Sequence, residues 1–108
     1  MRNDKRIGPE TLRLIAAKLS VLADESRLAI LNELRGGERT VTMLMEATGL
    51  SQPNISKHLR LLRQEKFVTF RKAGPHSFYR ICDPVVFQLC DLLCRALRTE
   101  LEKKSGEG

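Results

Sequence analysis

The sequence predicts one mainly α-helical domain that carries a single β-hairpin, in the order helix, helix, helix, helix, hairpin, helix. The length of 108 residues suits a single domain. Apolar residues recur at helical spacing over most of the chain, whereas one stretch rich in β-branched and aromatic residues surrounds a turn that contains glycine. We expect a flexible arm at residues 1–9, the domain at 10–102 and a frayed tail at 103–108.

The first two predicted helices are separated by a capping residue. Residues 10–22 place apolar side chains along one face of a helix. Asp24 is suited to cap a second helix over residues 25–35, because its carboxylate can accept a hydrogen bond from a free N–H of the first turn. Gly36 and Gly37 are expected to end that helix.

The third and fourth helices are predicted from similar signals at their ends. A short helix over residues 43–48 follows Thr42, a suitable N-cap, and stops at Gly49. The fourth helix begins after Ser51, another N-cap, and has Pro53 in its first turn, where no helical N–H is lost. The two helices are therefore joined by a very short turn.

The fourth helix separates an apolar face from a polar one. Ile55, Leu59 and Leu62 recur at i, i+4 and i+7 and are expected to face the core. At about 100° per residue, Lys57 and Arg60 point away from that stripe. The outward face is small, polar or cationic through its first two turns, so another surface could approach it closely.

The hairpin and the last helix complete the domain. Residues 67–81 predict two strands around Gly74, which is free to take a positive φ. Asp83 is suited to cap the last helix and Pro84 to occupy its first position. This helix carries an apolar stripe and is predicted to continue to Lys104.

The composition limits the class of protein. Hydrophobic residues make up 42% of the chain and charged residues 30%, as in a soluble globular protein. No apolar run approaches the roughly 18 residues of a membrane span, and the N-terminus lacks the apolar stretch of a signal peptide. We expect a cytoplasmic protein without a membrane partner. No Cys–His–acid triad or glycine-rich phosphate loop is present, so the sequence predicts no enzyme.

The positive charge is concentrated in one block. Residues 51–80 contain seven basic side chains and one acidic one, whereas the rest of the chain has 12 of each. The net charge of +6 therefore lies in the fourth helix and the hairpin. A basic block on a neutral body favours a polyanion as partner, although an acidic protein or a membrane surface would also suit it.

The third helix, the turn at Gly49 and the fourth helix have the pattern of a helix-turn-helix. The second helix of that motif enters the DNA major groove, where Gln and Asn pair with adenine and Lys with guanine. Other cations suit phosphates or a minor groove. These are Arg60, Arg63 and, near the hairpin tip, Arg71, Lys72 and His76. A solvated amphipathic helix without this function would carry similar charges.

The chain resembles the winged-helix repressors of the ArsR/SmtB family over about residues 15–100. The matching pieces are LADESRLAIL, the GGE turn, GLSQPNISKHLRLLR and a hairpin that ends in FYRI. The resemblance implies a winged helix-turn-helix fold, with the hairpin as the wing, and a homodimer that represses transcription and leaves DNA when an inducer binds. Apolar residues on the first and last helices fit such pairing, and a twofold dimer should read an inverted repeat in a double-stranded operator.

The resemblance also implies which positions touch bases. They are Gln52, Asn54, Ser56 and Lys57. His58 turns about 60° back toward the core stripe, so a packing or hydrogen-bonding role competes with a DNA contact there.

Two metal sites of the family have no counterpart here. The first uses two cysteines and an aspartate in the motif ELCVCDL, but Thr40, Thr42 and Met43 occupy those positions, and hydroxyls do not replace thiolates for a thiophilic ion. The second uses acids and histidines on the last helix. Asp83 matches one of these positions and is better explained as a helix cap. The two histidine positions and the other acid position are occupied by Val85, Ala96 and Thr99, which cannot replace them.

Three cysteines leave the inducer open between metal binding, redox chemistry and plain packing. Cys90 and Cys94 are four residues apart, so their Cβ atoms should lie about 5–6 Å apart on one helix face. One thiophilic ion such as arsenite, cadmium or zinc could bridge them. Cys82 would lie about 12 Å away along the axis, so a third sulfur would have to come from the partner chain. A redox or reactive-sulfur sensor, and cysteines that only fill the core, remain alternatives.

Overall fold

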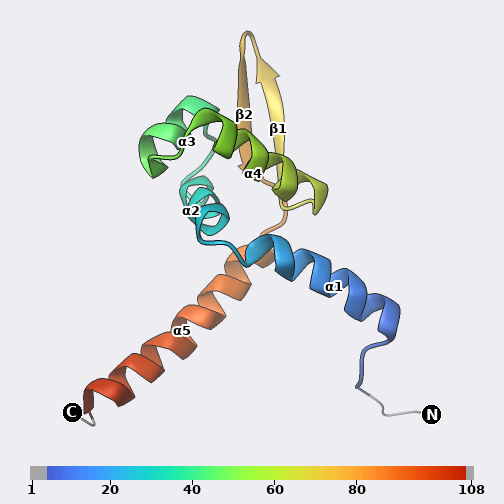
Figure 1. Cartoon of the computed structure of the whole chain (residues 1–108), viewed down its shortest axis with the longest axis vertical. Coiled ribbons are helices and arrows are strands. Elements are labelled where there is room, and N and C mark those ends of the chain that lie inside the picture. Colours follow the sequence, from blue (N-terminus) through green and yellow to red (C-terminus); the bar gives the residue numbers. More distant parts are fainter. Residues whose placement is uncertain (1–4, 107–108) are drawn as a thin grey trace.

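The computed structural model describes residues 5–106 and contains five helices and one antiparallel β-hairpin (Figure 1). The elements are α1 (Pro9–Leu22), α2 (Glu25–Leu34), α3 (Val41–Thr48), α4 (Gln52–Gln64), β1 (Val68–Ala73), β2 (His76–Ile81) and α5 (Val85–Gly106). This order confirms the predicted sequence of elements. None of the helices in the described part of the chain is both long and apolar enough to cross a lipid bilayer.

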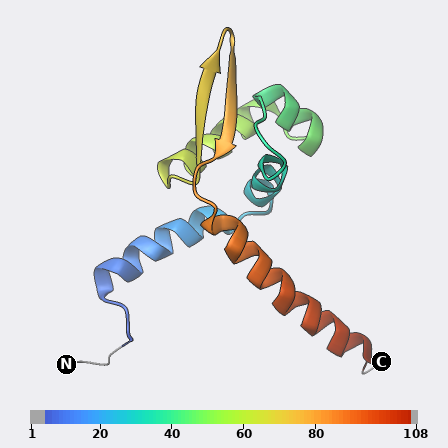
Figure 2. The same cartoon turned by 180° about the vertical axis from the view of Figure 1, so that it is seen from behind.

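The elements form a compact head and two diverging arms. Helices α2, α3 and α4 pack against one another and against the hairpin, while α1 and α5 extend away in different directions (Figures 1 and 2). Both arms leave large apolar side chains exposed to solvent. They include Leu12, Leu14, Ile15 and Leu19 on α1, and Leu92, Leu93, Leu97 and Leu101 on α5. A single protomer therefore does not cover all of its apolar surface.

The core of the head is built from the inner faces of its helices. As predicted, Ile55, Leu59 and Leu62 of α4 are buried, with at most 1% of each exposed. They belong to one cluster with Leu44 of α3 and Ile30 of α2. The helical spacing of these residues thus determines which side of α4 is hidden and which side is open.

The helix caps confirm three predictions and correct a fourth. The side chain of Asp24 accepts a hydrogen bond from the N–H of Arg27, that of Ser51 from Asn54, and that of Asp83 from Val85 at 3.0 Å. Helix α3 is instead capped by Thr40, whose hydroxyl accepts from the N–H of Met43 at 3.2 Å.

The predicted cap at Thr42 was wrong because α3 begins two residues earlier than expected. The preceding residue, Arg39, forms an isolated antiparallel bridge with Tyr79 of the hairpin. This pairing keeps the chain extended up to Thr40, so the helix turns there and Thr42 lies within its first turn. Both threonines are suitable N-caps by sequence, and the pairing of Arg39 with β2 favours Thr40.

The ends of the arms also differ from the expected limits. Helix α1 begins at Pro9, the last residue of the predicted arm, and α5 continues to Gly106, beyond the boundary expected at residue 102. The first two residues beyond that boundary, Lys103 and Lys104, are good helix formers. Residues 1–4 of the predicted arm and 107–108 of the predicted tail lie outside the described residues. The division into arm, domain and tail stays a prediction.

Glycine is required at the turn that joins α3 to α4. Gly49 adopts φ 76° and ψ 4°, a left-handed conformation, and its N–H donates to the carbonyl of Met45 at 2.8 Å. Apart from Gly49 itself and its two chain neighbours, no residue has an atom within 4 Å of the position that a Cβ would occupy. A larger residue at this position would therefore be strained by its backbone conformation and not by crowding.

We predict that Gly49→Ala lowers the free energy of unfolding by about 1–2 kcal/mol, because a Cβ disfavours the left-handed region. The matched control is Gly49→Asn, which should lose less because asparagine tolerates this conformation. Urea unfolding at one fixed protein concentration measures both changes. Equal losses in the two variants would show that conformation is not the cause.

Candidate nucleic-acid interface

Helices α3 and α4 form a helix-turn-helix in which α4 presents one face to solvent. The turn consists of Gly49, Leu50 and the cap Ser51. Because the inner side chains of α4 are buried in the head, its opposite face is held rigidly toward the outside. The hairpin stands beside α4, so the helix and the wing are both open to one large partner (Figure 1).

The four predicted base-reading residues all lie on this open face. Gln52, Asn54, Ser56 and Lys57 are exposed. The side-chain amide of Gln52 donates to the hydroxyl of Ser56 at 3.2 Å, so these two side chains lie along one another on the first turn. The face offers amide, hydroxyl and ammonium groups without any bulky apolar side chain.

The second half of α4 provides cations near the base of the wing. Arg60 and Arg63 are exposed, and the guanidinium of Arg63 lies 4.5 Å from the centre of the Phe70 ring on β1. Both arginines line a shallow groove with Lys66 and with the start of β1. Three cations along one groove suit an anionic backbone.

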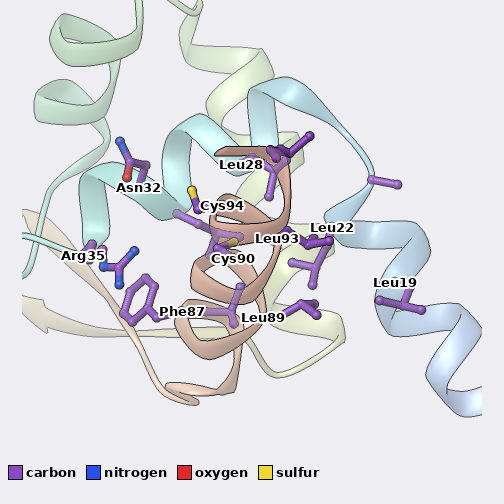
Figure 3. Close-up of a pocket in the computed structure, with 14 residues that line it drawn as sticks. Leu19, Leu22, Leu28, Asn32, Arg35, Phe87, Leu89, Cys90, Leu93 and Cys94 are labelled. Carbon is purple, nitrogen blue, oxygen red and sulfur yellow. The ribbon is translucent and has the colours of Figure 1, made fainter. Parts of the chain in front are cut away.

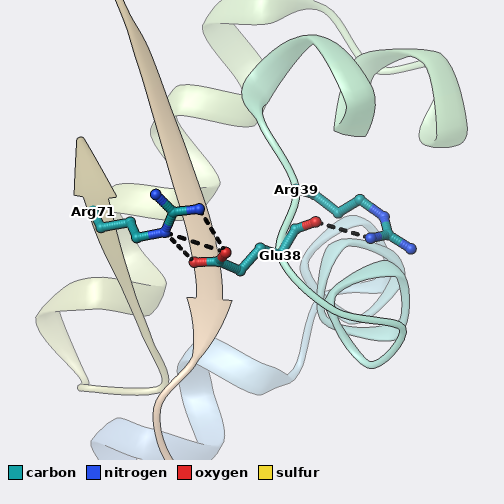
Figure 4. Close-up of polar contacts among 3 residues, drawn as sticks. All are labelled: Glu38, Arg39 and Arg71. Carbon is teal, nitrogen blue, oxygen red and sulfur yellow. Dashed lines mark hydrogen bonds and ion pairs between the residues drawn. The ribbon is translucent and has the colours of Figure 1, made fainter. Parts of the chain in front are cut away.

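The wing carries the other predicted cations, but one of them is ion-paired within the protein. Lys72 and His76 are exposed near the tip of the hairpin. Arg71, by contrast, binds the carboxylate of Glu38 with two guanidinium nitrogens, at 2.9 and 3.0 Å (Figure 4). These hydrogen bonds hold the pKa of the Glu38 carboxyl below its usual range. Sequence reasoning missed this pair because the two residues are far apart in the chain.

His58 lies to the side of the open face and has a partner within the protein. Its Nδ1 is 3.2 Å from a guanidinium nitrogen of Arg27 on α2. Burial lowers the pKa of His58, and the nearby carboxylate of Asp24 only partly opposes this effect. A neutral ring with Nδ1 accepting from Arg27 fits this arrangement. The hydrogen-bonding role considered for His58 is therefore the one observed.

The cysteines lie in two different places. Cys90 is half-buried and Cys94 exposed, and both line an apolar groove of about 580 Å³ between α1, α2 and α5 (Figure 3). Cys82 lies beside the cationic groove, where its thiol donates to the carbonyl of Lys66 at 2.9 Å. The structure thus brings two of the three predicted sulfur atoms to one groove. Within residues 5–106, no three side chains of His, Cys, Asp or Glu gather where they could hold a metal.

Sequence reasoning also missed a second ion pair, which involves a residue that lines the apolar groove. Arg35, the residue that caps the end of α2, binds both carboxylate oxygens of Asp91 on α5, at 2.7 and 2.8 Å. The same guanidinium lies 4.7 Å from the centre of the Phe87 ring. It places a fixed positive charge on the side of α5 that carries Cys90 and Cys94.

Comparison with known proteins identifies the segment that contains this interface. The sequence pattern of the arsR family of bacterial regulatory proteins matches residues 24–69, from the cap of α2 to the start of β1. That segment includes both helices of the helix-turn-helix and the turn between them.

Individual relatives cover more of the chain. The transcriptional regulator NmtR of Mycobacterium tuberculosis is 43% identical over 77 residues, which are 71% of this chain and 64% of NmtR. The chain thus spans less than two thirds of that relative. The arsenical resistance operon repressor of Escherichia coli is 41% identical over 86 residues, 77% of this chain and 72% of the repressor.

A solved structure extends the likeness to the fold. A homodimeric winged helix-turn-helix DNA-binding domain from Mycobacterium bovis, determined by NMR in solution, aligns with a TM-score of 0.79. It is 30% identical to this chain, and the alignment covers 95% of each. The winged helix-turn-helix fold predicted from the sequence is therefore confirmed.

Proposed function

The chain belongs to the ArsR family of bacterial regulatory proteins, and we propose that it is a homodimeric transcriptional repressor that binds operator DNA and leaves it when an inducer binds. The open face of α4 carries this proposal. Its first two turns expose amide, hydroxyl and ammonium side chains, while the opposite face is fixed in the core. Such a helix can enter the major groove and read base edges.

The proposed contacts divide into two kinds. Gln52, Asn54, Ser56 and Lys57 read bases, because they occupy the exposed N-terminal part of α4. Cations further along contact phosphates or a minor groove. These are Arg60, Arg63, Lys72 and His76. Because DNA is the partner, we place the protein in the cytoplasm, and this role needs no catalytic activity.

We further propose that a second copy of the chain covers the apolar groove between the arms. The groove is lined by leucines of α1 and α5 that a monomer leaves exposed. Pairing the same surfaces across a twofold axis buries them and places two α4 helices on one side of the dimer. The homodimeric state of the Mycobacterium bovis domain supports this arrangement.

For the inducer, we propose a thiophilic metal or metalloid held by Cys90 and Cys94. Both sulfurs line the same groove, and the Escherichia coli relative is a repressor of an arsenical resistance operon. Two thiols from one protomer do not complete the four ligands usual for structural zinc, so a zinc site would need sulfurs from both copies. Arsenite and cadmium are the other ions to test.

Redox sensing is the second candidate for these cysteines. Cys94 is exposed and Cys90 is half-buried, and thiols that react with oxidants or reactive sulfur need to be accessible. A third possibility is that the cysteines only fill the apolar groove, where cysteine behaves as a small hydrophobic residue.

We predict a solution mass of twice 12.3 kDa at micromolar concentration, because the exposed leucines of the arms need a partner. Leu93→Lys should shift the mass toward the monomer by placing a charge in the groove. Met43→Lys, an exposed apolar position on α3, is the control and should stay dimeric. Light scattering measures all three, and a monomeric parent would contradict the proposal.

We predict that Lys57→Ala weakens operator binding by about 1–3 kcal/mol and relaxes sequence preference, because it removes a base contact. Arg63→Ala should weaken all sequences alike and reduce the log–log salt slope by about 0.9, because it removes one phosphate contact. Lys103→Ala, a basic position outside the block, is the control. Gel shifts at two salt concentrations, with DNA from the chain's own promoter, measure these effects.

The same titration separates DNA binding from a different class of function. A basic module that binds only proteins would show no operator complex and no steep dependence on salt. That result for the parent would overturn the repressor proposal.

We predict that arsenite, cadmium or zinc lowers the operator affinity of the reduced dimer, and that Cys90→Ser and Cys94→Ser abolish this response. Cys82→Ser is the matched control and should respond like the parent, because its thiol lies outside the groove. A full response in the Cys90 and Cys94 variants would exclude the pair. Loss of binding with an oxidant alone would favour redox sensing, and no response in the parent would favour packing.

A further inference from the structure

An ion pair connects the segment before α3 to the middle of the wing. Glu38 lies between α2 and α3, and Arg71 lies on β1. The Arg71 Nε is 2.9 Å from one carboxylate oxygen, and its Nη2 is 3.0 Å from the other (Figure 4). Two parallel N–H···O bonds fix the guanidinium in one plane as well as at one distance.

Backbone hydrogen bonds next to this ion pair also join the wing to the segment before α3. The N–H of Arg39 donates to the carbonyl of Tyr79 at 3.0 Å, and the N–H of Tyr79 donates to the carbonyl of Arg39 at 2.8 Å. The segment before α3 is therefore joined to β2 by one isolated antiparallel bridge. Glu38 precedes this bridge and reaches past β2 to the next strand, so one short segment is joined to both strands.

The guanidinium of Arg71 also contacts an aromatic ring of the wing. It lies 4.8 Å from the centre of the Phe78 ring, and Phe78 is its register partner on β2. A side chain with a ring against its face and a carboxylate on two of its nitrogens has a fixed direction. Lys72, the next residue, makes no ion pair with any described residue and is exposed.

The charge of Arg71 is balanced where it stands. Its partner is a full carboxylate, so the pair presents little net charge to a DNA phosphate. Exposed ion pairs also contribute little to overall stability, because water screens them. What this pair does provide is a directed connection, because two hydrogen bonds join β1 of the hairpin to the segment that leads into α3 and α4.

We propose that Arg71 is a positioning residue, and that the clamp formed by Glu38 and Arg71 holds the wing where Lys72 and His76 can reach DNA beside the site read by α4. The inference rests on the proposed DNA-binding function, and it revises the expectation that Arg71 itself binds phosphate. The competing arrangement is that Glu38 holds Arg71 back from DNA.

The two arrangements predict opposite results for Glu38→Gln, which keeps the shape of the side chain and removes its charge. If the clamp positions the wing, Glu38→Gln and Arg71→Gln each weaken operator binding by roughly three- to thirtyfold, and the double variant is no worse than either single one. The log–log salt slope should fall in both variants toward the value of Lys72→Ala, because a displaced wing loses the phosphate contact of Lys72. Lys72→Ala is the matched control and should reduce the slope by about 0.9.

A second measurement tests the clamp without DNA. In the free dimer, amide hydrogen exchange at Arg39 and Tyr79 should become faster in Glu38→Gln and Arg71→Gln, because the bridge opens more often. The same amides should be unchanged in Lys72→Ala. Core amides of α4 should be unchanged in all three variants.

The results distinguish failure of the clamp from failure of the DNA-binding function. Tighter operator binding by Glu38→Gln, or a slope that falls in Arg71→Gln but not in Glu38→Gln, would make Arg71 a phosphate ligand and overturn the inference. If the parent binds no operator, the proposed function fails. Exchange rates that do not change in the Glu38 and Arg71 variants would overturn the clamp in that case as well.

Discussion

The structure depends on the burial of one side of α4. Ile55, Leu59 and Leu62 enter the core from a helix whose exposed residues are mostly polar or cationic, and they share that core with Leu44 and Ile30. Because the interior is close-packed, the helix cannot rotate about its axis without opening cavities. The packing that stabilises the head therefore also fixes the direction of every side chain on the outer face. One face of α4 thus contributes to stability, and the opposite face is available for recognition.

Much of the fold could be predicted because its signals are local. The helical spacing on α4, the caps at Asp24, Ser51 and Asp83, and the left-handed glycine of the turn each depend on residues within a few positions of one another. The cap of α3 could not be located in this way. Thr40 and Thr42 are equally good caps locally, and the choice was made by a bridge to β2 some 40 residues further on. The ends of a helix or strand cannot be predicted from local sequence where contacts with distant residues determine them.

The candidate site also has features that follow from local sequence and features that depend on the fold. Exposure of the polar side of α4 follows from its helical period, so the sequence predicted which of its residues are exposed. The partners of charged side chains were not predicted, because Glu38 and Arg71, like Arg35 and Asp91, are brought together only by the fold. A count of basic residues treats Arg71 and Lys72 as equal, whereas one is paired and oriented and the other is exposed without a pair among the described residues. Charge in a sequence therefore indicates the partner's sign, and only the structure indicates which cations are available to it.

The separation of head and arms determines how an inducer would act. Cys90 and Cys94 lie in the groove between the arms, while α4 and the wing lie in the head, so a ligand at the cysteines would not touch DNA. Its effect would have to pass through the relative position of the arms. For α1, the link to the head includes Lys18, which donates to the carbonyl of Glu65 at the end of α4 and lies over the ring of Phe67. A ligand alters DNA affinity only if it binds one arrangement of the arms better than another. In the proposed twofold dimer the arms would fix the spacing of the two α4 helices, so a change in the groove would move both helices relative to an inverted repeat.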